Sequence, residues 1–149
     1  MRRTAWLIGS ILLPTLLATP ALAQAPAERS LFDSWNAGLC EVTDTARLDI
    51  YAPSHVTRIE VMFHWDEGEK SASFTLAKAD GGALATGTLT RSPGCDPAAP
   101  GWCGAQTTLA LDLPAATYQV RAGRTAICRN ADSDDSGFIR AFGNAPPAP

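Results

Sequence analysis

Apolar and polar residues alternate through the middle of this chain. In the segment VTRIEVMFHW, residues 56–65, the apolar residues Ile59, Val61, Phe63 and Trp65 fall on every second position. Most of the positions between them are polar or charged. A period of two is typical of a β-strand with one buried face, so we expect these side chains to point into a core.

Turn-forming segments separate this strand from further alternating stretches. DEGEK at 66–70 and DGG at 80–82 predict tight hairpin turns, and a shift in the apolar pattern predicts a β-bulge at Gly87. The other expected strands are TARLDIY at 45–51, SASFTLAKA at 71–79, ALATGTLT at 83–90, TTLALDL at 107–113, ATYQVRAG at 116–123, TAICR at 125–129 and GFIRAFG at 137–143. About eight short strands predict an all-β fold, expected to be a two-layer antiparallel β-sandwich, with a small β-barrel as the alternative.

The start of the chain has the features of a signal peptide, residues 1–23. Arg2 and Arg3 precede an apolar stretch, and the small residues in ALA at 21–23 predict cleavage after Ala23. The alternative, a membrane-anchoring helix, needs about 20 apolar residues, and this stretch is shorter. We therefore expect an exported protein, periplasmic or secreted, that is not embedded in a membrane.

The next segment, ERSLFDSWNAG, places Leu31, Phe32 and Trp35 on one face of a helix and ends in glycine, which predicts a short helical segment. The last residues are rich in proline and alanine, which is typical of extended linkers. The expected parts are thus a signal peptide at 1–23, an N-terminal linker with a short helical segment at 24–39, the β-sandwich domain at 40–143 and a flexible tail at 144–149.

The charge of the chain is slightly acidic. It has 12 Lys and Arg residues against 15 Asp and Glu, a formal net charge of −3 at pH 7. Cleavage of the signal peptide removes two arginines and makes the mature chain more acidic. Because the remaining arginines are spread among acidic residues and form no basic stripe, we expect no nucleic-acid partner.

The four cysteines all follow the predicted cleavage site, and an even number in an exported chain predicts disulfides. Four cysteines allow three pairings. Cys95 and Cys103 bound the loop CDPAAPGWC, whose prolines and glycine can bend the chain back, so we expect this pair to bond and to leave Cys40 for Cys128. A structural zinc site is the alternative, but the sequence lacks the C-x-x-C pair that such sites use.

An acidic run near the C-terminus, CRNADSDDSG, places Asn130, Asp132 and Asp134 at alternating positions, as in the first half of a calcium-binding loop. Asp135 stands where such a loop needs glycine, and Ala141 stands where it needs glutamate. We therefore expect a solvated turn in which Asp and Ser side chains bond nearby backbone amides, and no metal site.

The two histidines, His55 and His64, are too far apart on one expected strand to share a metal or a catalytic triad. Asp66, Glu67 and Glu69 cluster in a hairpin turn, where carboxylates are typical of a solubilising tip and not of an acid and base pair. The sequence shows no catalytic constellation, so we expect neither enzyme activity nor a cofactor.

Trp102 lies inside the expected disulfide loop, beside Gly101 and Cys103, where burial is hard to arrange. A rigidly held, exposed tryptophan can stack on a sugar ring or fill a pocket in a partner. In the alternative, its ring folds back over its own disulfide. We take Trp102 as the candidate binding residue.

Two segments near the C-terminus form a longer pattern, LPAATYQVRAG at 113–123 and CRNADSDDSGFIRAFG at 128–143. This pattern resembles the ending of small exported bacterial β domains, which have L-P-x-G-T-Y-x-V followed by an asparagine, a serine-rich turn and G-F-x-R-x-x-G. Ala116 replaces the glycine of that pattern. The resemblance implies export and a β fold, and these domains have no agreed activity.

Together these features favour a non-catalytic binding domain of the bacterial envelope, with a glycan or a protein as its ligand. The alternative is an envelope structural protein, or an inhibitor that inserts a loop into the cleft of a hydrolase. The partner recovered from envelope material would separate the two.

Overall fold

The computed structural model describes residues 27–95, 97 and 99–145, so the predicted signal peptide lies outside the described residues. The strands are β1 (Arg29–Asp33), β2 (Glu41–Thr43), β3 (Thr45–Ile50), β4 (Ser54–His64), β5 (Ser71–Lys78), β6 (Ala83–Cys95), β7 (Trp102–Leu113), β8 (Ala116–Ala122), β9 (Ile127–Arg129) and β10 (Ile139–Asn144). A single 3₁₀ turn, η1 (Ala131–Ser133), is the one helical element in this part of the chain. The predicted all-β fold is confirmed.

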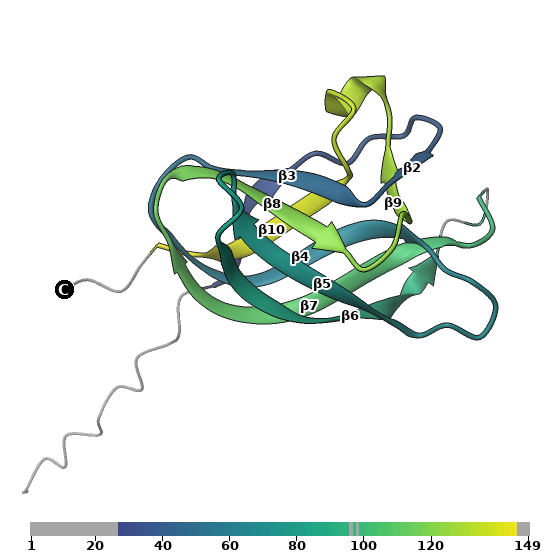
Figure 1. Cartoon of the computed structure of the whole chain (residues 1–149), viewed down its shortest axis with the longest axis horizontal. Helices are drawn as coiled ribbons and strands as arrows, with labels where there is room; N and C mark the ends of the chain where they lie inside the picture. Colours follow the sequence, from purple (N-terminus) through teal and green to yellow (C-terminus); the bar gives the residue numbers. More distant parts are fainter. Residues whose placement is uncertain (1–26, 96, 98, 146–149) are drawn as a thin grey trace, which may run out of the picture.

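One antiparallel sheet contains all of these strands (Figure 1). Its order is β1-β10-β4-β7-β6-β5-β8-β3, and the short strands β2 and β9 pair beside it, with β9 also bridging to β4. The sheet curls until its edge strands, β1 and β3, approach each other and it nearly closes. The sequence predicted a sandwich, with a small barrel as the alternative. The chain forms one nearly closed sheet around a single core.

The strand β4 carries the clearest alternation, and its predicted core face is confirmed. The four predicted residues are all buried: Ile59, Val61, Phe63 and Trp65. Val56 is buried as well, although it has the opposite parity. A register shift between Val56 and Arg58, against β7, resets the alternation so that Val56 and Ile59 both face inward.

The hairpin of β5 and β6 differs from expectation at one glycine. The β-bulge predicted at Gly87 is wrong, because Gly87 pairs directly with Phe74 and the register shift lies between Leu76 and Ala77. A Cβ atom on Gly87 would lie 2.9 Å from Phe74 Cε1. Glycine at this position therefore makes room for a buried ring and does not mark a break in the ladder.

The N-terminal segment differs most. Arg29–Asp33 forms β1, so the expected short helical segment is wrong, and the sheet begins well before the expected boundary at residue 40. β1 pairs with the edge of β10, and a register shift between Ser30 and Phe32 lets Leu31 and Phe32 both pack against the core. A strand satisfies the backbone groups that β10 presents at its edge, which a helix cannot do.

Two serine side chains bond backbone amides at one end of the sheet, one between the end of β1 and β10 and one between the segment before β10 and β3. Ser34 Oγ accepts a hydrogen bond from Ile139 N at 2.9 Å, and Ser136 Oγ accepts one from Arg47 N at 2.7 Å. Each hydroxyl takes the place that a neighbouring strand's carbonyl would occupy.

The flexible tail was expected at residues 144–149. Asn144 instead ends β10, and residues 146–149 lie outside the described residues.

Both predicted disulfides are confirmed. Cys40 bonds to Cys128 across 88 positions of sequence, and Cys95 bonds to Cys103 across 8. Disulfides form and persist in oxidising surroundings, so the pair indicates an oxidising, extracellular type of compartment.

Candidate functional site

Trp102 is the first residue of β7 and lies directly opposite His64, the last residue of β4. The preceding turn places Gly101 at a φ of 90°, a conformation that glycine adopts without strain. Gly101 also passes close to the imidazole, since a Cβ atom there would lie 2.9 Å from His64 Nε2. Trp65 N donates to Gly101 O at 2.9 Å and so fixes the turn to the end of β4.

The indole of Trp102 packs edge to face against the imidazole of His64. Their ring centroids lie 5.1 Å apart, and the ring planes meet at 76°. Both residues are half-buried, so each ring keeps part of its surface in solvent while restraining the other. That Trp102 binds a partner stays a prediction.

Arg124 joins the loop after β8 to the loop after β4. Its Nη2 atom donates to His64 O at 2.7 Å and pairs with the carboxylate of Glu69. The guanidinium carbon lies 4.8 Å from the centre of the Phe63 ring, so the cation covers the end of the core. The hydrogen bond from Arg124 holds the pKa of Glu69 below its ordinary value, although burial acts in the opposite direction.

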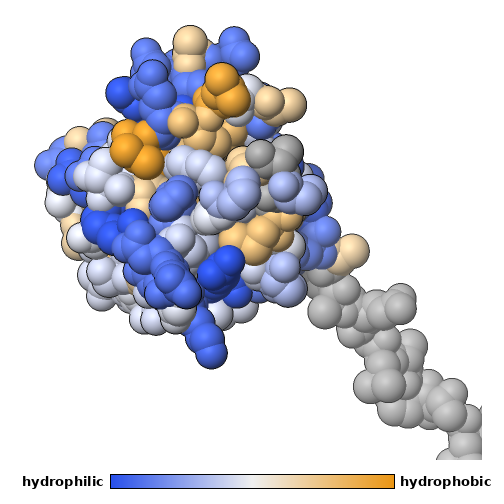
Figure 2. Space-filling view, turned by 90° about the vertical axis from the view of Figure 1, so that its right-hand side faces the viewer, coloured by the Kyte–Doolittle hydropathy of each residue, from blue (hydrophilic) through white to orange (hydrophobic). Residues whose placement is uncertain are grey.

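We call this surface the Trp102 end and define it by the side chains of His64, Glu69, Trp102 and Arg124 with the Cys95–Cys103 disulfide. Figure 2 looks onto this end of the molecule. The face is mostly hydrophilic, and its few strongly hydrophobic residues lie in the upper part of the view. The two rings offer a stacking face, and the Glu69–Arg124 pair, which contacts the backbone of His64, adds charged groups at the same end of the sheet.

The Cys95–Cys103 disulfide crosses the ladder between β6 and β7, with its two Cα atoms 4.0 Å apart. Cys103 is fully buried, whereas Cys95 is exposed. Arg91 on β6 places Nη2 3.2 Å from Cys103 Sγ and 3.5 Å from Cys95 Sγ. The bond therefore has one accessible cysteine, one inaccessible cysteine and a guanidinium beside both sulfur atoms.

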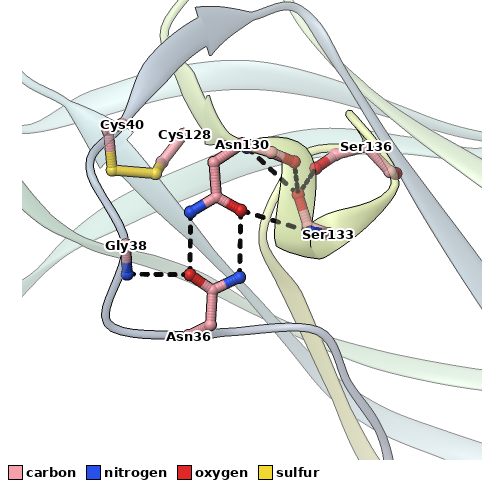
Figure 3. The surroundings of a disulfide bond; sticks show 7 residues. All are labelled: Asn36, Gly38, Cys40, Cys128, Asn130, Ser133 and Ser136. Carbon is pink, nitrogen blue, oxygen red and sulfur yellow. Dashed lines mark hydrogen bonds between the residues drawn. A yellow bond between two sulfur atoms is a disulfide. The ribbon is translucent and has the colours of Figure 1, made fainter.

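The acidic run forms a capped turn (Figure 3). Asn130 Oδ1 accepts from Ser133 N, and Ser133 Oγ accepts from Asn130 N, which is the capping box of η1. Asn130 also forms a reciprocal amide pair with Asn36, with nitrogen to oxygen distances of 2.8 and 3.0 Å. The Cys40–Cys128 disulfide lies beside this pair, and we call the whole arrangement the asparagine corner.

The aspartates of the run do not gather around a common point. The expected bonds from side chains to backbone amides are present, but Asn130 and Ser133 make them, while Asp132, Asp134 and Asp135 are exposed. Among the described residues, no three His, Cys, Asp or Glu side chains are placed to hold a metal ion. That the run does not bind calcium tightly stays a prediction.

The two histidines have separate surroundings. His55, near the start of β4, has its Nδ1 atom 2.7 Å from Asp112 Oδ1, and His64 at the other end of the strand contacts Trp102. The expectation that the histidines do not share a site agrees with these positions.

A hollow of about 440 Å³ lies at the opposite end of the sheet, between the β5–β6 turn and the β7–β8 turn. Lys78 and Asp80 line it together with small side chains. Its aromatic residue, Tyr118, is buried, with its hydroxyl donating to Pro114 O at 2.9 Å, so this ring offers no stacking face. The Trp102 end is therefore the stronger candidate.

The partners of Trp102 and of the small disulfide were not predicted from the sequence. His64 reaches Trp102 only through the register of β4 and β7, and Arg124 contacts the His64 backbone from a loop distant in sequence. A local signal did exist for Arg91, because it lies four positions before Cys95. The strand expected to end at Thr90 continues, as β6, through Pro93 and Gly94 to Cys95.

Comparisons of the chain with protein-family models, with curated proteins and with solved structures find no match in any of the three. The described residues also contain no helix that is long and apolar enough to cross a membrane. What the Trp102 end can bind must therefore be inferred from its own side chains.

Proposed function

We propose that this chain is a non-catalytic binding domain exported to the bacterial envelope, periplasmic or secreted, which holds a glycan or a protein through the Trp102 end. The observation that carries the proposal is the half-buried Trp102, restrained by His64 and by a disulfide-closed loop. A ring held in this way loses little conformational freedom on binding. Binding residues also concentrate on loops held by a rigid scaffold.

The charged groups at the same end of the sheet as the ring suit a polyhydroxylated ligand. A sugar can place its apolar face on an indole while its hydroxyl groups bond to neighbouring charged side chains. Glu69 and Arg124 are already oriented by their mutual pair, so they need little further ordering when a ligand arrives. An extended protein loop that carries hydroxyl or amide groups could use the same surface.

The test is to compare binding and stability in one variant, Trp102→Ala, of the mature chain 24–149. Partners are first identified on a glycan array and by pull-down from envelope material. We expect Trp102→Ala to weaken the identified partner by about 2 kcal/mol or more, roughly thirtyfold, because a central aromatic anchor is removed. The free energy of unfolding, measured by chemical denaturation, should fall by about 1 kcal/mol or less.

Tyr51→Ala is the matched control. Tyr51 is an exposed aromatic residue between β3 and β4, at the end of β4 opposite to His64, and its ring centre lies 6.3 Å from that of Phe32. This change should lower stability little and leave binding intact. A Trp102→Ala variant that loses much stability and keeps its partner in full would show that the ring is packing, and the proposal would fail.

The same pull-down addresses the alternative, an envelope structural or hydrolase-inhibitor protein. A recovered hydrolase whose activity falls when the purified chain is added would favour the inhibitor. Retention on a polysaccharide that is lost in Trp102→Ala favours the binding domain.

A further inference from the structure

We propose that the Cys95–Cys103 disulfide is a thiol-exchange site, at which an external thiol attacks Cys95 and Cys103 leaves as a thiolate beside Arg91. The inference stands on the unequal access to the two cysteines and on the contact of one guanidinium with both sulfur atoms. It does not depend on the binding function proposed above.

Access decides which sulfur is attacked. Thiol-disulfide exchange needs the nucleophile to reach one sulfur from the side opposite the other. Cys103 is 0% exposed, whereas Cys95, the last residue of β6, is exposed. The external thiolate therefore reaches Cys95, and Cys103 is the leaving group.

The step balances without a separate oxidant. The external thiol gives its proton to water, and a lone pair of its sulfur forms a new bond to Cys95 Sγ. The bond between the two cysteines breaks, and its electron pair stays on Cys103 Sγ, so one disulfide is exchanged for another. If a second thiolate then attacks the external sulfur of the mixed disulfide, Cys95 leaves as a thiolate, the loop is reduced and two external thiols become one disulfide.

Arg91 stabilises the charge that forms on the leaving sulfur. A leaving thiol departs faster when its pKa is lower, and a neighbouring cation lowers the pKa of a thiol. The Nη2 atom is already 3.2 Å from Cys103 Sγ, and Arg91 N donates to Lys70 O at 2.9 Å, so the strand holds the residue in place before exchange begins.

The second disulfide provides an internal reference with different surroundings. Cys128 is fully buried, Cys40 is half-buried, and the nearest cation along the chain, Arg129, is paired with Glu41 at 3.3 Å. Both bonds are present in every molecule, so their opening rates can be compared under identical conditions.

The experiment incubates the oxidised mature chain 24–149 with reduced glutathione, quenches samples with acid, alkylates free thiols and maps tryptic peptides by mass. Cleavage after Arg91 and Arg121 places both cysteines of the small loop on one peptide, residues 92–121, whereas Cys40 and Cys128 fall on two peptides. We expect the small loop to open at least about tenfold faster than the long one, with glutathione attached to Cys95.

Arg91→Gln should slow this opening by about fivefold, because the cation beside the leaving sulfur is lost. Arg121→Gln is the matched control: it removes the same charge at an exposed position whose hydrogen-bond partner is Gln119, and the rate should not change. If Arg91→Gln folds poorly, Arg91→Lys keeps the charge without the planar fork and should give an intermediate rate.

Three results would overturn the proposal. They are equal or faster opening of Cys40–Cys128 in the unaltered chain, attachment of glutathione to Cys103, and an unchanged opening rate in both folded Arg91 variants.

Discussion

Cys40 and Cys128 are separated by 88 positions of sequence, whereas Cys95 and Cys103 are separated by 8. The first bond ties the segment after β1 to β9, beside neutral amides that bond to one another at the asparagine corner. The second bond joins two strands that already pair, at the Trp102 end, where charged side chains dominate. From the lengths of the two closed loops, we expect the long bond to stabilise the whole fold and the short one to order a single loop.

The largest expected effect is the loss of stability when either disulfide is removed. Replacing Cys40 and Cys128 together by alanine should lower the free energy of unfolding by about 4 kcal/mol, because the unfolded chain gains the entropy of a long open loop. Replacing Cys95 and Cys103 together should cost about 2 kcal/mol, because the loop they close is short. Chemical denaturation of the two double variants provides the measurement, and each serves as the control for the other. Equal losses of stability in the two double variants would show that loop length does not set the contribution of each bond.

A smaller effect is expected at the asparagine corner itself. Asn130→Ala removes both the cap of η1 and the amide pair with Asn36, so we expect a loss of about 1.5 kcal/mol of stability. Asn36→Ala removes the pair and its bond to Gly38 N but leaves the cap, and should cost less. Asp132→Ala, an exposed change in the same turn, is the control and should stay within about 0.5 kcal/mol. Thermal unfolding can rank the three variants, and a harmless Asn130→Ala would show that the disulfide alone holds the corner.

The smallest expected effect is a dependence of stability on pH, which we expect at the Trp102 end and not at the asparagine corner. The hydrogen bond from Arg124 lowers the pKa of Glu69 from its ordinary value of 4.5. Stability from this pair is therefore present above pH 4.5 and is lost as the pH falls through the lower, folded-state value. Because both groups are partly exposed, the contribution should be about 1 kcal/mol or less after screening by solvent.

Glu69→Gln should accordingly be less stable than the unaltered chain at pH 7 and should match it once the unaltered chain's carboxyl is protonated. Denaturant midpoints across this range measure the difference, with Glu67→Gln as an exposed control in the same loop. A difference in stability between Glu69→Gln and the unaltered chain that stays constant with pH would mean that the ionised pair does not cause the difference. The cap and amide pair of the asparagine corner, built from neutral groups, should show no such dependence.

The strands could be predicted because their signal is local. Each run of alternating residues, such as Phe74 and Leu76 or Tyr118 and Val120, shows which side chains face inward without knowledge of the neighbouring strand. β1 could not be predicted in this way, because Leu31 and Phe32 are adjacent and both pack on the core through a register shift. Only the free edge of β10, more than 100 residues later, turns that segment into a strand.

The chemistry around the candidate site was harder to predict than its position. The pairing of the cysteines followed from their spacing, and Trp102 stood out as one large ring in a small loop. His64, which restrains Trp102, comes from β4, whereas Arg91 contacts the sulfur atoms from β6, the strand of Cys95. Which of these side chains meet depends on the register of the strands. A single sequence does not specify that register where Pro93 and Gly94 lie within the end of a strand.

The pairing of the first strand with the last, β1 with β10, has a consequence for the order of events during synthesis. A chain made from its N-terminus cannot complete this sheet until its final strand, Ile139–Asn144, has emerged. Such non-local pairing slows folding, because a long loop must close before its contacts form. During that delay Cys95 and Cys103 are both available before Cys128, and the loop between them is short, so their native bond can close first and leave Cys40 free until Cys128 arrives.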